Sequence, residues 1–501
     1  MFNSRERSKR PLQRQALARP TRSSADSSRV TNYAARYSNT TNENQRLYEY
    51  ESKTKDCFDK IENVLRDISA MQHESDFAGS AQNLAKAQLG FALPEQLLKD
   101  CWIKPLDIGQ LYVWCVFETF RRFSEEFFIE QPLVRESEED FQHFLQSCGF
   151  HTIDVSPCAD GRLAHVISYV LRLPYKAVRR KSYAGAMFDV EDSLQKWVET
   201  EMLRHREGKP NLASDDTRYL KIAAYHFSSV MPEHEGCAAH GSDVQLAAAA
   251  AQEKLLNFRQ GVENSFCCGA SIDLLLIGLD TDTDSIRIHV PNAEGNMEID
   301  SYIDTLTLYQ QTNSMFQNLN EQGIVEYLEK SLGDDSVSSP RKGMLKLIAR
   351  LIHGNLQQVD YVKRYHGGNY QDIGHQERFI GMGIGFEEIQ LRNLTYFSYL
   401  KTVEEGAKDL DVGIKIFTGL NIRRGLPVPV IIRYDYHGLV PGARARAESR
   451  CQQLETALKQ RYADLADQGY IHTLLMVRDC NSDTKAEVIG CSVSITSEAL
   501  H

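Results

Sequence analysis

The stretch HTIDVSPCADGR, residues 151–162, predicts a strand that ends in a sharp turn. Apolar and polar residues alternate up to Pro157, which has no N–H to donate and so ends a strand's pairing. Gly161 then lets the backbone turn, and the following residues, 163–173, are apolar at helical spacing. Three reactive side chains stand on this strand-to-helix turn: Cys158, Asp160 and Arg162. In open α/β sheets such turns usually carry the chemistry.

The composition is typical of a soluble globular protein, with 42% hydrophobic and 25% charged residues among 501. This length predicts several domains. No apolar run approaches the roughly 20 residues of a membrane span, so we expect no membrane segment. Residues 1–37 hold nine Arg or Lys against Glu6 and Asp26, a balance of +7, which leaves −18 on the rest of a chain whose net charge is −11. So acidic a body is not expected to bind nucleic acid.

Changes in composition and periodicity predict four parts of the chain. Residues 1–50 are rich in Arg, Ser, Asn and Thr and poor in large apolar residues, which predicts a disordered basic arm. Organellar transit peptides have similar compositions, but Pro11 and Pro20 would interrupt a helix, so an arm that binds an acidic partner is favoured. Residues 51–147 have helical periodicity and predict an all-α domain. The remainder divides into two α/β parts: a catalytic domain, 148–388, and a C-terminal domain, 389–501.

The catalytic part predicts a parallel sheet, because strand-like and helical segments alternate along it. The predicted strands are 151–156, 219–227, 271–279 and 285–290, and the predicted helices are 163–173, 190–206 and 243–260. The C-terminal part repeats this order, with strands at 428–434 and 471–478 around a helix at 443–464. We therefore expect a degenerate copy of the catalytic domain that has lost its metal ligands. The glycine-rich segments 366–370 and 381–385 predict a flexible loop over a site.

Two later segments supply partners for Cys158 if that residue binds a metal. The predicted strand YLKIAAYHF ends near His226, and Cys237 follows in EGCAAHGSD, just before a helix whose N-terminus favours a thiolate. A catalytic zinc needs three protein ligands and one open position, which Cys158, His226 and Cys237 would provide. His240, three residues after Cys237, is the alternative histidine, although it does not stand at a strand end.

Asp160 and Arg162 suit a role beside that metal. A carboxylate paired with a guanidinium stays ionised and is held in one orientation by two hydrogen bonds. Zinc brings the pKa of its bound water to about 7. A carboxylate next to that water accepts the hydroxyl proton, which turns the lone pair of the hydroxide toward an electrophile. For the two residues taken alone a structural ion pair at a turn is favoured, but Cys158 before them and the later His and Cys favour the role beside a metal.

The order Cys158-x-Asp160-x-Arg162, followed by a later His and Cys, resembles the zinc site of β-class carbonic anhydrases. The segments PCADGRLAHVISYVLRLPY, GCAAHGSD and ENSFCCGAS resemble more closely the shell-associated carbonic anhydrase of α-carboxysomes, a divergent β-class branch. This resemblance covers nearly the whole chain. It implies that Cys158, His226 and Cys237 bind Zn2+ and that Asp160 and Arg162 orient a zinc-bound hydroxide. Ten residues separate His226 from Cys237, where the wider β class has two.

The reaction implied by the resemblance is the reversible hydration of CO2 to bicarbonate. Family members act in the carboxysome lumen or on the inner face of its shell, where they supply CO2 to Rubisco. The family also implies a homodimer or a higher homo-oligomer, with the basic arm as a tether to Rubisco or to a shell component. The sequence does not identify the group that carries the proton away, for which His366 and His375 are the two candidates considered.

Two other functions remain open: a zinc hydrolase or deaminase, and a non-catalytic, zinc-stabilised adaptor of a protein assembly. A deaminase would need a second thiol after Pro157-Cys158, which is missing. A further, speculative prediction concerns a basic cluster that suits a phosphorylated sugar such as ribulose bisphosphate as an effector. The cluster consists of Arg179, Arg180 and Lys181. A solvated basic face is the simpler interpretation of these three residues.

Overall fold

The structure is a computed structural model, which describes residues 33–99, 101, 103–127, 133, 136–209, 218–266, 272–292, 294–312, 320–332, 341–384, 386, 391–398, 406–481 and 485–493. The chain divides into two compact units, residues 1–42 and 43–501. The side-chain contacts and the candidate site described below lie in the second unit, and helix α1 (Tyr33–Asp59) begins in the first. Within the described ranges, no helix combines the length and the apolar character needed to cross a membrane.

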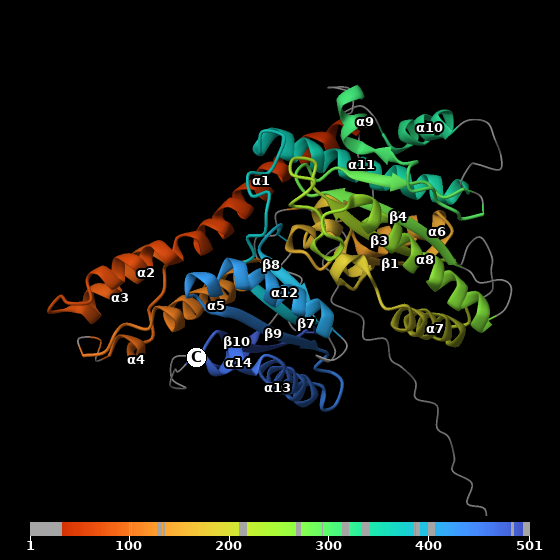
Figure 1. The fold of residues 1–501 in the computed structure, drawn as a ribbon. Helices are drawn as coiled ribbons and strands as arrows, with labels where there is room; N and C mark the ends of the chain where they lie inside the picture. The colour runs from red at the N-terminus through yellow and green to blue at the C-terminus, as the bar shows by residue number, and fades with distance from the viewer. Residues whose placement is uncertain are drawn as a thin grey trace, which may run out of the picture. The chain divides into compact units, whose positions relative to one another are not determined.

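Helices make up the first part of the described chain, as the periodicity predicts. They are α1 (Tyr33–Asp59), α2 (Ile61–Ala70), α3 (Phe77–Gln88), α4 (Glu95–Leu98), α5 (Ile108–Phe127) and α6 (Glu138–Ser147) (Figure 1). One face of α2 is apolar and buried, and it includes Ile61, Leu65 and Ile68. Helix α1 already includes residues 33–50, which the sequence assigned to the disordered arm, and Leu47 within it is buried in the apolar core. The rest of the arm, residues 1–32, lies outside the described residues.

Six strands of the described chain form the catalytic sheet, in the order β2-β1-β3-β4-β5-β6. Their bounds are β1 Phe150–Pro157, β2 Arg179–Arg180, β3 Arg218–Phe227, β4 Ile272–Asp280, β5 Ile286–His289 and β6 Ile303–Asp304. The strands from β2 to β4 are parallel, as predicted, whereas β5 and β6 are antiparallel to their neighbours. The predicted parallel sheet is therefore mixed at β5, because only residues 281–285 join β5 to β4 and a connection this short can only reverse the chain.

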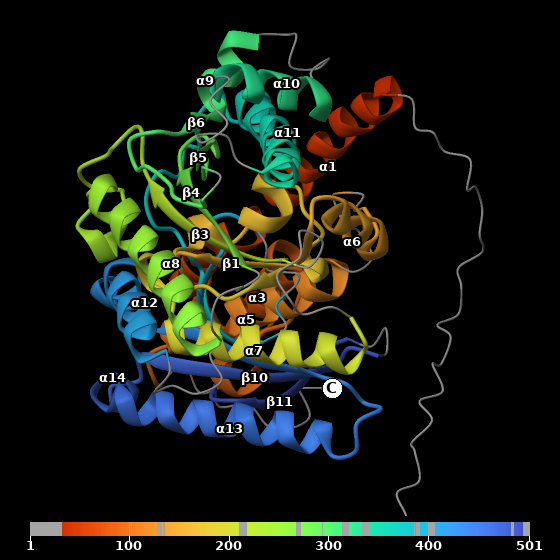
Figure 2. The same ribbon diagram turned by 90° about the vertical axis from the view of Figure 1, so that its right-hand side faces the viewer.

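Helices cover the catalytic sheet on both sides. They are α7 (Val190–Arg206), α8 (Val244–Phe266), α9 (Thr305–Thr312), α10 (Glu321–Leu332) and α11 (Lys342–Tyr365). Helix α8 packs against β3 and β4, and α11 packs against β5. Figure 2 shows α8 and α11 on opposite sides of the central strands. The nearly uninterrupted apolar sequence of β4 is explained by this double coverage.

The segment after the catalytic turn is not the regular helix that the spacing in residues 163–173 predicts. It forms a 3-10 turn, Gly161–Leu163, and then a π-helical turn, Val166–Val170. Widened turns of this kind are frequent at functional sites. Between the two turns, His165 Nε2 lies 2.7 Å from the buried carboxylate of Asp284. This tertiary contact takes precedence over the helical pattern of the sequence.

Five strands of the described chain form a second sheet, in the order β11-β10-β9-β7-β8. Their bounds are β7 Phe379–Ile384, β8 Thr395–Ser398, β9 Val428–Tyr436, β10 Ile471–Asp479 and β11 Glu487–Cys491. Neighbouring strands are parallel except β10 and β11. The accompanying helices are α12 (Ala407–Leu420), α13 (Ala443–Arg461) and α14 (Ala463–Asp467), and α13 packs along β9 and β10 (Figure 2). Strand β7 lies where a flexible loop was predicted. The sequence did not indicate a strand there because the glycines of β7 weaken the strand pattern.

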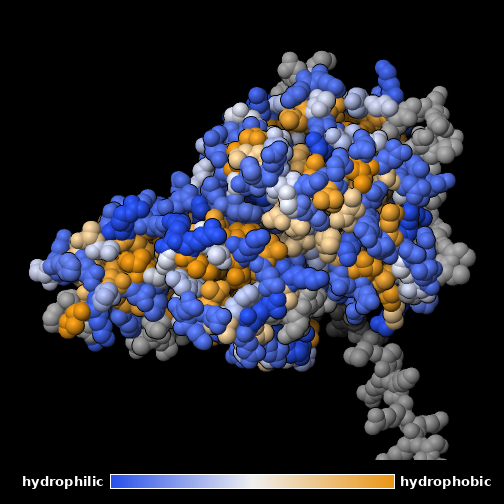
Figure 3. Space-filling view, in the orientation of Figure 1, coloured by the Kyte–Doolittle hydropathy of each residue, from blue (hydrophilic) through white to orange (hydrophobic). Residues whose placement is uncertain are grey.

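Buried apolar side chains join these parts in the described chain. One cluster is formed by the catalytic sheet and the helices packed on it. A second joins the first helices to the second sheet. Within it the ring of Phe120 in α5 lies 5.2 Å from the ring of Phe379 in β7. A third cluster lies between the second sheet and helices α12 and α13, and it includes Ala159. The catalytic turn is therefore packed against the C-terminal part of the chain. On the face drawn in Figure 3, apolar residues reach the surface as patches among hydrophilic ones.

The approach of α11 to the segment after the catalytic turn depends on Gly354. A Cβ at this position would lie 2.6 Å from the carbonyl oxygen of Leu171, closer than a nonbonded contact allows. We expect Gly354→Ala to lower the free energy of unfolding by about 1–3 kcal/mol. Gly419→Ala in α12 is the matched control, since a Cβ there meets no described atom within 4 Å, and alanine in a helix is better than glycine by about 0.5–1 kcal/mol. Denaturant titrations compare the variants, and equal loss of stability in both would contradict this account of the packing.

Candidate metal centre

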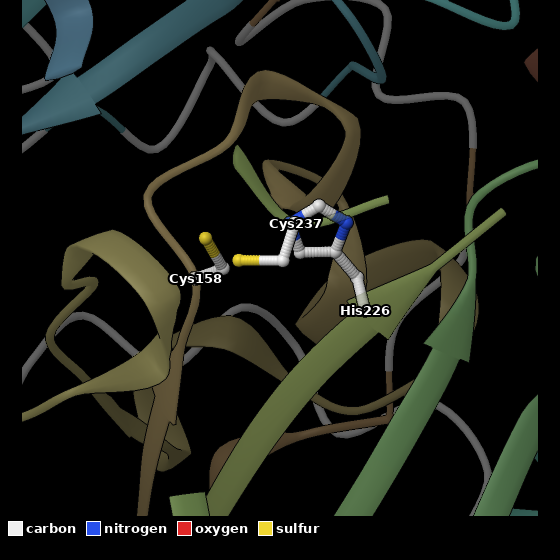
Figure 4. Close-up of side chains that lie close together, drawn as sticks. All are labelled: Cys158, His226 and Cys237. Atoms are coloured by element: carbon white, nitrogen blue, oxygen red, sulfur yellow. The ribbon is translucent and has the colours of Figure 1, made fainter. Parts of the chain in front are cut away.

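The three predicted metal ligands meet at the carboxyl end of the catalytic sheet. Cys158 directly follows β1, His226 is the second-last residue of β3, and Cys237 lies in the loop between β3 and α8. One ligand atom from each side chain lies within 4.8 Å of the others, and all three residues are buried. Figure 4 shows the two sulfur atoms next to each other, beside the imidazole ring.

The pairing of neighbouring strands brings Cys158 and His226 together. The Cys158 N–H donates to the carbonyl oxygen of Ala224 at 3.1 Å, two residues before His226, so both side chains leave the sheet at the same edge. Cys237 comes from a compact turn instead. Its carbonyl oxygen accepts the N–H of Ser242 at 3.0 Å, which holds the loop close to the strand ends.

Polar contacts surround both sulfur atoms. The Gly185 N–H donates to Cys158 Sγ at 3.2 Å, and Cys237 accepts backbone N–H groups from Ala239 and His240. The hydrogen bond with Cys237, together with burial, raises the pKa of the Cys158 thiol well above its usual range. The same hydrogen bond lowers the pKa of Cys237, against the effect of burial. The thiolate is the form of cysteine that binds a metal, so metal binding at these two sulfurs would release their protons.

The His226 ring is available to a metal ion. Both ring nitrogens are buried and lack a hydrogen-bond partner within the described residues, and Asp160 Oδ2 lies 3.5 Å from Nε2 without a hydrogen bond. An unpaired buried polar group is costly, and a bound metal would remove that cost. Two thiolates and one imidazole form a known donor set of catalytic zinc sites, which keep a fourth position open. The residues present therefore fit zinc.

His240, the alternative histidine, is not part of the ligand cluster found among the described residues. Its Nε2 lies 3.2 Å from the carbonyl oxygen of Gly185. A Cβ on Gly185, whose φ is +67°, would approach that nitrogen to 2.7 Å. His240 therefore supports the residue that donates to Cys158 rather than lying beside the two sulfurs.

Asp160 and Arg162 form a buried ion pair with two side-chain hydrogen bonds. Arg162 Nε donates to Oδ1 at 2.9 Å, and Nη2 donates to Oδ2 at 2.7 Å. Burial alone would raise the pKa of Asp160, but Arg162, and after it His375 and His226, hold that pKa well below its usual range. Asp160 lines the same small cavity as the ligand cluster, so an ionised and fixed carboxylate faces the space beside the sulfurs.

The C-terminal part of the chain supplies the other wall of this cavity. Tyr396 of β8 and Val412 and Ile416 of α12 form an apolar side. The sequence analysis missed these three residues, because an apolar side chain on a later strand or helix carries no chemical signal. Only the packing of the two sheets places them opposite Cys158.

The structure brings one of the two histidines considered for proton transfer to the cavity. His375 lines it, whereas His366 Nε2 lies 3.3 Å from the hydroxyl of Tyr361. His375 Nδ1 lies 3.0 Å from Glu377 Oε1. Although burial opposes protonation, the carboxylates of Glu377 and Asp160 raise the pKa of His375 to about 9. The sequence analysis missed Glu377, which the His-x-Glu spacing could have indicated.

Comparisons with known proteins identify the family of this chain. Family models for the carboxysome shell carbonic anhydrase match residues 39–128 (N-terminal), 140–375 (catalytic domain) and 376–493 (C-terminal). The carboxysome shell carbonic anhydrase of Parasynechococcus marenigrum (strain WH8102) is 52% identical over 463 residues, which cover 91% of this chain and 79% of that protein. The chain belongs to the carboxysome shell carbonic anhydrase family.

Other family members show the same relationship. The protein of Prochlorococcus marinus (strain MIT 9313) is 52% identical over 462 residues, with 91% of this chain and 89% of the relative aligned. That of Halothiobacillus neapolitanus (strain ATCC 23641 / c2) is 43% identical over 442 residues, with 87% and 86% aligned. Membership confirms the resemblance stated from the sequence, the enzyme class, carbonic anhydrase, and the location, the carboxysome. The family also suggests a metal, and the buried Cys-His-Cys group could hold it.

Replacing His226 and His240 in turn tests which of these two histidines binds the metal. We expect His226→Gln to abolish stoichiometric metal binding, because it removes one of three donors at the cluster. His240→Gln should retain the metal, since His240 contacts a backbone carbonyl instead. Metal analysis of the purified proteins measures both outcomes. Loss of the metal in His240→Gln with retention in His226→Gln would reverse the assignment.

Proposed function

We propose that this family member is a zinc carbonic anhydrase that hydrates CO2 to bicarbonate reversibly. Cys158, His226 and Cys237 would hold the metal, and Asp160 with Arg162 would orient the attacking hydroxyl group. The observation that carries the proposal is the convergence of three buried ligand side chains beside a buried Asp–Arg ion pair, at one edge of one sheet.

Zinc at this site supplies a Lewis acid that makes water acidic enough to lose a proton near pH 7. Asp160 determines how a hydroxyl group lies in the cavity. The Asp160 carboxylate accepts hydrogen bonds from the N–H, Nε and Nη2 of Arg162, and an ionised carboxylate cannot donate one. A hydroxyl group beside Oδ2 must therefore direct its proton at Asp160 and its lone pairs elsewhere in the cavity.

The apolar wall of the cavity suits CO2, which is small and carries no net charge. Val412 and Ile416 come from α12, and Tyr396 comes from β8. These apolar side chains exclude water from part of the cavity, and electrostatic contacts act more strongly where water is excluded. The chain thus offers a dry side to CO2 and a charged side to the hydroxyl group.

Replacing the orienting carboxylate tests this assignment. We expect Asp160→Asn to lower kcat for CO2 hydration about 100-fold with one zinc ion per chain retained, because an amide can donate as well as accept and no longer imposes one orientation. Stopped-flow assays and metal analysis measure the two quantities.

The matched control for this variant is Asp411→Asn. The Asp411 side chain is 49% exposed and pairs with Arg461 on the surface. The kcat of Asp411→Asn should therefore equal that of the wild-type protein. Full activity in Asp160→Asn would contradict the orienting role. A wild-type chain that binds zinc but does not hydrate CO2 would overturn the proposed reaction. The non-catalytic, zinc-stabilised adaptor would then be the remaining candidate function.

The names of the relatives associate those proteins with the carboxysome shell. We propose the same association for this chain, where it would supply CO2 to Rubisco as a homodimer or a higher homo-oligomer. The basic arm, with a balance of +7 over residues 1–37, would be the tether to Rubisco or to a shell component. Its charge supports attraction to an acidic surface.

The tether predicts binding that depends on salt. Deleting residues 1–32 should weaken binding to Rubisco or to shell proteins at least tenfold and leave CO2 hydration unchanged, because it removes none of the proposed site residues. For the full-length chain, raising the salt from about 0.05 M to about 0.3 M should weaken the same binding, since exposed charges are screened. Biolayer interferometry measures both, and binding that is insensitive to salt would contradict an electrostatic tether.

We further propose that the C-terminal domain, 389–501, is a degenerate copy of the catalytic domain, 148–388, without its zinc ligands. The second sheet, which also includes β7 from before residue 389, has the strand order β8-β7-β9-β10-β11. It repeats the order β2-β1-β3-β4-β5, with the same parallel and antiparallel neighbours. In this comparison of the two sheets, β9 corresponds to β3. Where β3 carries His226, the end of β9 carries Asp435, which pairs with Arg433 at 2.8 Å.

The basic cluster predicted to bind a phosphorylated sugar has partners inside the protein. Arg179 donates to the hydroxyl of Thr200, Arg180 donates to the carbonyl oxygen of Ala164 at 2.7 Å, and Lys181 pairs with Asp192 at 3.0 Å. These contacts favour a structural role for the three charges. The effector, ribulose bisphosphate, stays a prediction.

A further inference from the structure

Glu377 is a buried acid beside the active site to which the reaction above assigns no role. Its side chain has no exposed surface, and it reaches the catalytic turn from the segment that leads into the second sheet. Oε1 accepts the Gly161 N–H at 3.2 Å and lies 3.0 Å from His375 Nδ1. A single carboxylate oxygen therefore joins the turn between Asp160 and Arg162 to an imidazole that lines the cavity.

The glycine at position 161 makes this contact possible. A Cβ there would lie 2.6 Å from Glu377 Cγ and 2.8 Å from Oε1, so any other residue would push the carboxylate away. The carbonyl oxygen of Gly161 also accepts the N–H of Asn393 at 2.9 Å. The catalytic turn is thus built to receive the segment that carries His375 and Glu377.

The contact with Glu377 determines which nitrogen of His375 faces the cavity. His375 Nδ1 contacts Glu377 Oε1, whereas His375 Nε2 lies 3.8 Å from Asp160 Oδ2. The charged groups around the ring are the carboxylates of Glu377 and Asp160 and the guanidinium of Arg162. The two carboxylates raise the pKa of His375 to about 9, although burial opposes this. A carboxylate oxygen within 4 Å of each ring nitrogen favours the imidazolium form, in which both nitrogens are donors.

An anionic product finds little other positive charge in this cavity. Arg162 directs its side-chain nitrogens to Asp160 and to the backbone carbonyls of Glu235 and Ile373. Among the described residues that line the cavity, His375 is the one cationic side chain once His226 is bound to a metal. Its side chain is 21% exposed, against 4% for Asp160, so it lies where the cavity approaches solvent.

We propose that His375 is a further catalytic residue, which donates its Nε2–H to an oxygen of bicarbonate, and that Glu377 is the positioning residue that holds this imidazolium. The proposal rests on the reaction and the ligand set proposed above. Hydrogen bonds between charged groups are stronger than neutral ones, and His375 keeps its proton throughout. The product anion is stabilised by this contact without a proton transfer.

The test measures anion binding separately from turnover. Cobalt-substituted protein has a visible spectrum that changes when an anion binds at the metal, and azide serves as the probe. We expect Glu377→Gln and His375→Gln each to weaken azide binding about tenfold, the factor for one lost charge-assisted hydrogen bond, and to raise the KM for bicarbonate. The metal content should stay at one ion per chain.

The control and the double variant decide whether Glu377 acts through His375. Glu487→Gln makes the same chemical change at a side chain that is 51% exposed, and it should leave azide affinity unchanged. Adding Glu377→Gln to His375→Gln should cause little further loss, because residues that act as one unit are not additive. A further tenfold loss in the double variant would overturn the positioning role.

Other results would overturn the donor role of His375. Unchanged azide affinity in His375→Gln with the metal retained would do so, and this variant decides the point alone if Glu377→Gln does not fold. If turnover then falls and added imidazole buffer restores it, His375 transfers protons instead. Failure of the proposed function is recognised separately, because it would already be seen in the wild-type protein as absent zinc or absent CO2 hydration.

Discussion

The active site depends on one fully buried guanidinium. A charge is tolerated inside a protein only when it is paired and hydrogen-bonded, and Arg162 meets this condition with oxygens from three segments. Besides Asp160, it donates to the carbonyl oxygen of Glu235 at 2.6 Å and to that of Ile373 at 3.2 Å. One side chain therefore links the catalytic turn, the loop before Cys237 and the segment before His375. Removing one partner of a buried ion pair costs about 3–5 kcal/mol, so this arrangement is fixed rather than adjustable.

A second buried charge holds the segment that follows the turn. Asp284 Oδ2 accepts the hydroxyl of Tyr370 and the amide of Gln358, each at 2.9 Å, and lies 2.7 Å from His165 Nε2. Gln358 belongs to α11 and Tyr370 to the loop after it, while His165 follows the catalytic turn. Contacts with His165 and other donors hold the pKa of Asp284 below its usual value, although burial opposes this. The acidic turn after β4 thus ties the catalytic segment to the helix that covers it.

The two halves of the chain contribute different properties to the cavity. The catalytic sheet carries the thiols, the ligand histidine and the orienting ion pair, all of which are polar or reactive. The C-terminal part adds apolar side chains from α12 and β8, and the connecting segment adds His375 and Glu377. Ala159 itself packs into the core of the second sheet. The catalytic domain alone would leave the cavity open on the side where CO2 is expected.

Local pattern was enough to predict the candidate metal centre of this protein. Strand β1 was predicted to within one residue at each end, and the reactive residues after it were recognised because alternation, proline and glycine act on neighbouring positions. His226 was found for the same reason, since it stands at the end of a strongly apolar strand. These features depend on a few consecutive residues, and so does the family resemblance that follows from them.

Contacts between distant segments decided the rest. Gly161 and Glu377 are 216 positions apart, and no periodicity relates them; only the packing of the two sheets brings them within a hydrogen bond. The tertiary structure also includes His226, and not His240, in the candidate ligand cluster among the described residues. It has 3-10 and π turns where a helix was predicted and the strand β7 where a glycine-rich loop was predicted. Secondary structure follows local preference where nothing opposes it, but a buried charge must find its partners wherever they lie in the chain. At this site those partners came from the tertiary structure.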